Sequence, residues 1–255
     1  MEVHAHTHTA RKKWTHYLWE FLMLFLAVFC GFLAENFREH LIEHAKEKVF
    51  VKSLAEDLKK DTARLNYSIR RLKAHISAAE KLVLLYVKDN KDKDYNKNMA
   101  FYGREAGKSV DVVFSDRTSS QLKGTGSIRL IRKKDLVDSL QQYWNNQLRI
   151  EQIHSRHESS RMEQRKIGSK TFYWYPLSFI DDGREEETFY QDSSITNLHL
   201  EKITGICNPQ LLVEFMNVTA ILYNIGKSQY FRELEQELLL AKNLILLIKN
   251  KYHLE

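Results

Sequence analysis

The spacing of two histidines and a glutamate is the first feature of the sequence that could support catalysis. His40-Leu-Ile-Glu43-His44 has the H-x-x-E-H form of one class of zinc metalloproteases. On a helix the two histidines share a face, as zinc ligands would. Short motifs have a high rate of chance matches, so we expect a solvated helix face rather than a metal site.

No other catalytic or cofactor motif is present. The chain has no phosphate-binding loop, no G-x-G-x-x-G and no G-x-S-x-G, and its two cysteines, Cys30 and Cys207, form no C-x-x-C pair. Alternating histidines near the N-terminus could bind zinc, nickel or copper loosely, and we expect a disordered tail there. These are His4, His6, His8 and His16. We therefore expect a protein that is not an enzyme and uses no cofactor.

An apolar run near the N-terminus predicts a membrane-spanning helix over residues 14–35. No residue between Phe21 and Ala34 is charged, and Glu20 lies close enough to the predicted interface to reach it. Three aromatic residues that favour the headgroup region extend the run: Trp14, Tyr17 and Trp19. A cleaved signal peptide is disfavoured, because cleavage needs small residues before the cut, and Phe32 stands two positions before Ala34.

The basic residues that flank this helix favour one orientation. Arg11, Lys12 and Lys13 crowd the N-terminal side, whereas the other flank has more widely spaced basic residues. The positive-inside rule then predicts a cytoplasmic tail over 1–13 and a periplasmic domain over 36–255, in a bacterial inner membrane.

Small residues on the predicted span suggest contact with another helix. Ala27, Gly31 and Ala34 have the spacing that lets membrane helices approach closely, so we expect a homo-oligomer or another membrane or envelope protein as partner. Nucleic acid is not expected as a partner. The net charge is +6, but basic and acidic residues are mixed along the chain rather than gathered in blocks.

The remainder of the chain predicts an all-α fold. Only 9 glycines and 2 prolines occur in 255 residues, and apolar residues recur at intervals of three and four over 51–86, 133–167 and 209–248. We expect one transmembrane helix that continues into an elongated antiparallel helical bundle. Asp61 stands at an apolar position of the first stripe, where a polar residue usually fixes the register.

Several local features are predicted between these helices. Ser115 or Asp116 caps a short helix that ends at Gly124, and Asn208 caps a last helix that begins at Pro209. The apolar stripe of the last helix changes phase near Gly226. Residues 89–97 read as an exposed loop. In the helix over 133–167, three polar residues continue the apolar stripe: Gln147, His154 and His157. We therefore expect this end of the helix face to be exposed to solvent.

An irregular aromatic segment is predicted over 168–207. If the helix over 133–167 packs antiparallel to the first, the aromatic residues return towards the bilayer. We favour a role in capping the helical core, because aromatic side chains usually bury their large areas internally. The alternative is contact with a partner protein. The residues concerned are Phe172, Tyr173, Trp174, Tyr175 and Phe179.

Two stretches resemble a known family. Residues 11–40 look like the opening of a family of uncharacterised single-pass inner-membrane proteins of Bacteroidetes-type bacteria. Residues 116–131, with the pattern that continues to Tyr143-Trp144, resemble the second landmark of that family. The resemblance covers most of 11–160 and implies an anchor with an extracytoplasmic helical domain, without a known activity.

The sequence therefore predicts a membrane-anchored envelope protein that acts as a scaffold, sensor or adaptor for a partner. The alternative is a membrane-tethered metal-dependent hydrolase that uses His40, Glu43 and His44.

Overall fold

The described residues of the computed structural model, 13–88, 93–174 and 205–253, form an all-α protein. They contain no strand, only an isolated bridge between Phe172 and Ile206. The chain divides into two compact units, residues 1–51 and 52–255. Helix α1 (Trp14–Tyr86) contributes residues to both units as one uninterrupted element.

The first unit consists of the N-terminal half of α1. From Trp14 to Val49 its large apolar side chains are exposed, and the rings of Phe21, Phe25 and Phe29 stack on one another along successive turns. Within the described part of the chain, α1 alone is long and apolar enough to cross a membrane. Its most apolar stretch has a mean hydropathy of 2.0, and none of that stretch is buried.

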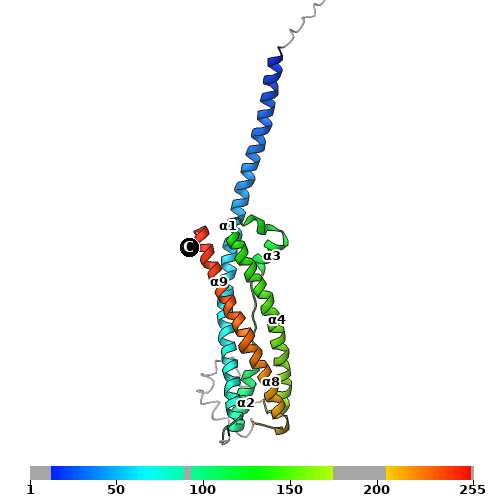
Figure 1. The fold of residues 1–255 in the computed structure, drawn as a ribbon, viewed down its shortest axis with the longest axis vertical. Coiled ribbons are helices and arrows are strands. Elements are labelled where there is room, and N and C mark those ends of the chain that lie inside the picture. Colours follow the sequence, from blue (N-terminus) through cyan, green and yellow to red (C-terminus); the bar gives the residue numbers. More distant parts are fainter. Residues whose placement is uncertain (1–12, 89–92, 175–204, 254–255) are drawn as a thin grey trace, which may run out of the picture. The chain divides into compact units, whose positions relative to one another are not determined.

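The second unit contains the rest of α1 and all the other described elements (Figure 1). After α1 come α2 (Tyr95–Ala106), a return segment without regular structure (residues 108–116) and α3 (Arg117–Gly124). A 3-10 turn η1 (Ser127–Leu130) leads into the long helix α4 (Lys134–Thr171). The last described elements are η3 (Pro209–Leu211), α8 (Leu212–Ile225), the π-helical turn η4 (Gly226–Tyr230) and α9 (Phe231–Tyr252).

Helix α4 runs in the same direction as α1. Tyr143 of α4 contacts Asp61 of α1, and further along both helices Ile167 shares a core cluster with Leu82. The expectation that 133–167 packs antiparallel to the first helix is therefore wrong. The physical reason is that the return segment already carries the chain back along α1 before α4 begins (Figure 1).

Helices α8 and α9 run in the opposite direction to α1 and α4. Phe215 of α8 lies in the same cluster as Leu82, near the C-terminal end of α1, whereas Leu234 of α9 packs with Leu65. The second unit is thus a helical bundle of mixed direction. Its core includes a cluster around Phe215, a second cluster around Tyr230 and a small alanine cluster around Ala79.

Several local predictions are confirmed. Helix α3 ends at Gly124, the side chain of Asn208 accepts a hydrogen bond from the Gln210 amide, and the last helix is interrupted by the π-helical turn η4 at Gly226. Asp116 occupies the N-cap position of α3, but its side chain makes no capping hydrogen bond there. Two other expectations are wrong. Helix α2 begins at Tyr95, inside the predicted loop, and His157 is buried rather than wet.

The end of α4 is sealed by aromatic side chains. Phe172 and Trp174 stack at a centroid separation of 5.7 Å, and both meet the ring of Phe215 edge-on. The Trp174 indole donates a hydrogen bond to the carbonyl of Ala100 at 2.9 Å. Gly168 lies directly beneath the indole, and a β-carbon at this position would come within 2.0 Å of the ring. The absence of a side chain at Gly168 is thus what lets the indole close the core.

Replacement of Gly168 by alanine should destabilise the protein by about 1–3 kcal/mol, because the clash outweighs the better helix propensity of alanine. The indole cannot move away easily, since it is fixed by the Ala100 carbonyl and the neighbouring rings. Gly124→Ala is the matched control, because a β-carbon there meets no atom within 4 Å. Urea unfolding followed by circular dichroism measures both, and equal stabilities of the two variants would contradict the prediction.

Candidate functional site

One face of α1 supplies hydrogen-bonding partners to the return segment. Ser68 donates to the carbonyl of Asp111 (2.8 Å), and Arg64 donates to the carbonyl of Val113 (3.1 Å). Asp61 accepts from the backbone N–H of Ser115 (2.8 Å). Two residues of extended chain advance about 6.6 Å, and one helical turn rises about 5.4 Å. Because these distances are similar, side chains on successive turns of α1 can reach alternate residues of the return segment.

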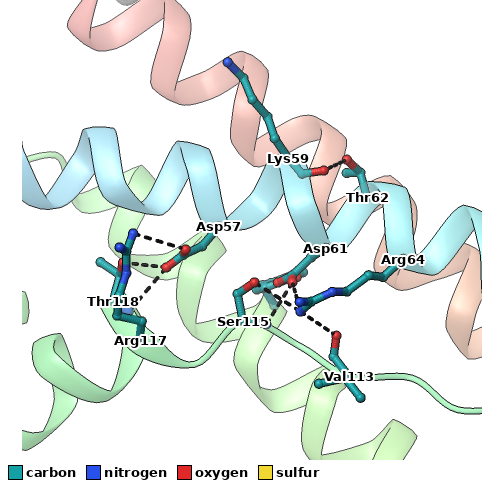
Figure 2. Close-up of polar contacts among 10 residues, drawn as sticks. Asp57, Lys59, Asp61, Thr62, Arg64, Val113, Ser115, Arg117 and Thr118 are labelled. Carbon is teal, nitrogen blue, oxygen red and sulfur yellow. Dashed lines mark hydrogen bonds and ion pairs between the residues drawn. The ribbon is translucent and has the colours of Figure 1, made fainter.

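Asp57 continues this pattern at the start of α3. Its carboxylate accepts hydrogen bonds from the Thr118 hydroxyl (2.5 Å) and backbone N–H (3.3 Å), and Arg117 lies 3.5 Å from the other oxygen. Figure 2 shows Asp57 and Asp61 projecting from α1 towards the residues that they bind. The two aspartates therefore tie the return segment and α3 to α1.

Asp61 also connects α1 to α4. The Tyr143 hydroxyl donates to its second oxygen at 2.9 Å, and Arg64 lies 3.9 Å from the first. Burial raises the pKa of Asp61, and the hydrogen bonds from Ser115 and Tyr143 oppose that rise. For Tyr143, burial together with the nearby carboxylates raises the pKa, so its hydroxyl remains a donor.

Another buried carboxyl, that of Glu237 on α9, lies close to Asp61. Its side chain is 0% exposed, and Oε2 accepts a hydrogen bond from the Asn146 amide of α4 at 2.9 Å. Burial raises the pKa of Glu237 to about 8, and the charge of Asp61 adds to the rise. At neutral pH the group is therefore mostly protonated. We call Asp57, Asp61, Tyr143, Asn146 and Glu237 the polar layer.

Two buried histidines line a small cavity beside the π-helical turn. His75 of α1 and His157 of α4 meet there with Gly226 of η4, and the space holds about one water molecule. In the described part of the chain, the Nδ1 atom of each histidine has no hydrogen-bond partner. A third histidine, His154, lies 3.0 Å from the hydroxyl of Tyr230, which donates to the Val110 carbonyl.

Burial keeps both cavity histidines neutral. It lowers the pKa of His75 to about 3, with further lowering by Arg71 and Lys108, and lowers the pKa of His157 to about 4. The same nearby cations make the cavity unfavourable for a metal ion. Among the described residues, no group of three or more histidine, cysteine or acidic side chains could hold one.

The sequence-derived metal candidates do not meet in such a group either. His40, Glu43 and His44 lie on α1 in the first unit, and the Nδ1 atom of His44 is 3.4 Å from Glu47. His4, His6 and His8 lie outside the described residues. The proposed helix-contact residues, Ala27, Gly31 and Ala34, are all exposed on the apolar part of α1.

The aromatic candidates separate into two groups. Phe172 and Trp174 are buried in the core around Phe215 and are therefore not available to a partner, whereas Tyr173 is 52% exposed. Tyr175 and Phe179 lie outside the described residues. The sequence pattern does not reveal the polar layer, apart from Asp61, which is a carboxylate at an apolar position of the first stripe.

Comparison with known proteins adds no further constraint on the site: no protein-family model, curated protein or solved structure matches the chain.

The cavity histidines should make the second unit sensitive to acid. A histidine whose pKa is lowered by folding contributes stability that is complete above about pH 6.5 and is lost as the pH falls. Each should cost about 1.4 kcal/mol per pH unit below that value. The free energy of unfolding of a His157→Gln variant should therefore fall less steeply between pH 6.5 and 4.5 than that of the wild type, as measured by urea unfolding.

The control for this measurement is His253→Asn, since His253 is exposed at the end of α9 in a left-handed conformation that asparagine tolerates. It should keep the wild-type slope. A His157→Gln profile parallel to that of the wild type would contradict the assignment.

Proposed function

We propose that the protein is a non-enzymatic, single-pass membrane protein that acts as a scaffold, sensor or adaptor for a partner protein. It resides in a bacterial inner membrane, with the tail over 1–13 in the cytoplasm and the helical domain in the periplasm. The observation that carries this proposal is helix α1 itself. One uninterrupted helix supplies the exposed apolar stretch of the first unit and core residues of the second, such as Leu58 and Leu65.

The exposure of the apolar stretch supports a membrane anchor. Large apolar side chains between Trp14 and Leu33 are exposed on every side of the helix, as in Val28 (70%) and Phe32 (63%). Water penalises such a surface by roughly 25 cal/mol per Å², whereas lipid does not. A buried core helix of a soluble protein would instead have most of this stretch covered.

The second unit supports an interaction role more than catalysis. In the described residues, three buried carboxyl groups make contacts between elements. Asp61 binds the return segment, Asp57 binds the start of α3, and Glu237 binds Asn146 of α4. The small cavity beside His75 and His157 has a volume of about 10 Å³, which is enough for one water molecule and too small for a substrate. A partner protein, bound at the surface, needs no such cavity.

Arginine substitution at Val28 tests the anchor. An arginine at mid-bilayer costs about 2.5–3.5 kcal/mol on insertion scales, so Val28→Arg should reduce recovery in the carbonate-washed membrane fraction. Leu84→Arg is the matched control, because Leu84 lies on the same helix and is 68% exposed. It should leave the protein in the membrane fraction. Equal recovery of the two variants would refute the anchor, and an alkaline phosphatase fused to the C-terminus reports the orientation.

A scaffold or adaptor should retain its partner when it is extracted gently. We expect protein extracted from its native membrane in mild detergent to run with a stoichiometric second protein, or with further copies of itself. Analytical ultracentrifugation and mass spectrometry of the purified complex measure this. Purification as a monomer without a bound protein, from membranes and after crosslinking, would count against the proposed role.

A further inference from the structure

Glu237 differs from the other buried acidic residues of the second unit. Among the described residues, each of the others has a basic side chain within 4.0 Å. For Asp57 it is Arg117, for Asp61 it is Arg64, for Glu233 it is Arg149, and for Glu105 it is Lys108. Glu237 has no basic partner: the Asn146 amide donates to Oε2, the Gln147 amide lies nearby, and Oε1 has no hydrogen-bond partner among the described residues.

The surroundings of Glu237 favour a neutral carboxyl over an anion, although two amide side chains, Asn146 and Gln147 of α4, act in the opposite sense. Its other neighbours are Asp61 of α1, Tyr143 of α4, and Glu233 one turn earlier on α9. Two of these are themselves acidic. The nearby guanidinium groups already face other carboxylates, Arg64 at Asp61 and Arg149 and Arg232 at Glu233. A buried anion without a cation costs several kcal/mol.

The element that carries Glu237 begins at a structural irregularity. Helix α9 starts directly after the π-helical turn η4, where the hydrogen-bonding pattern of the last helix is interrupted. Such turns often occur at functional positions. Tyr230, the last residue of η4, is 0% exposed and is fixed to the Val110 carbonyl, so the turn itself is anchored while α9 extends beyond it. The turn is therefore a natural point for α9 to pivot.

We propose that α9 is a proton-gated latch: with the Glu237 carboxyl protonated, α9 stays packed against α1 and α4, and loss of that proton releases it at η4. The proton leaves to solvent, and the resulting carboxylate becomes hydrated when α9 opens. Release uncovers apolar side chains that α9 covers, among them Leu65 of α1 and Ile150 of α4. This latch gives the domain a surface that is available only above a threshold pH.

The direction of the effect follows from the pKa of about 8 in the closed state. A carboxyl whose pKa is raised in the closed state stabilises that state fully below its ordinary pKa of about 4.5, and the stabilisation is lost as the pH rises towards 8. Over that range the equilibrium constant for release increases about tenfold per pH unit, and above about pH 8 it is constant.

Hydrogen exchange of the full-length protein in detergent micelles tests the latch. Measurements from pH 7.0 to 9.5 lie above the ordinary histidine pKa of about 6.5, so His75 and His157 are mostly neutral in both states. After correction for the intrinsic exchange rates, the opening constant of the amides over 231–252 should rise about tenfold per pH unit up to about pH 8 and then level off. The amides of α4 should not follow this profile. A flat wild-type profile over α9 overturns the proposal.

Two variants assign the titration to Glu237. Glu237→Gln resembles the protonated carboxyl, and Glu237→Met fills the same space without a polar group, so both should give a flat profile. Glu235→Gln, two residues away and 52% exposed, should keep the wild-type profile. A slope that persists in the Gln and Met variants overturns the proposal. The result does not depend on where the protein resides or on its partner, so the latch and the proposed function can fail separately.

Discussion

The structure of the second unit depends on the hydrogen bonds between the α1 face and the return segment. An extended chain that lies against a helix cannot satisfy its backbone groups by regular secondary structure, and a buried backbone group without a partner costs about 1–3 kcal/mol. Ser68, Arg64 and Asp61 each supply one partner at the spacing of the helical turns, and Asp57 holds the start of α3. These four side chains hold a non-helical segment and the start of α3 against α1.

The return segment in turn determines the direction of the later helices. It runs in extended form along α1 from Ser68 to Asp61, and α3 continues to Asp57, so the chain reaches the N-terminal end of the second unit before α4 begins. Helix α4 must then run parallel to α1, and Tyr143 meets Asp61 early in its course. Helices α8 and α9 then run back along α1 and α4. They do so through η4, and α9 brings Glu237 to the same level as Asp61.

The sequence predicted what is local and missed what depends on the path of the chain. The all-α class, the end of α3, the cap at Asn208 and the phase change near Gly226 all follow from patterns within a few residues. The direction of α4 does not, because a stripe of apolar residues is the same read in parallel or antiparallel packing. Asp61 was noticeable as an interruption of a stripe. Glu237 was not, because its partner Asn146 lies 91 positions away in the chain.

The buried groups of the second unit give its stability two opposite dependences on pH. His75 and His157, with lowered pKa values, favour the unfolded state below pH 6.5, whereas Glu237, with a raised pKa, favours it as the pH rises from 4.5 to 8. Between pH 4.5 and 6.5 the two histidines outweigh the one glutamate, so stability increases with pH. Above pH 6.5 the two histidines contribute no further change, whereas deprotonation of Glu237 continues to lower the stability up to about pH 8. The combined contribution of these three groups is therefore largest near pH 6.5, and on the alkaline side it depends on Glu237 of α9.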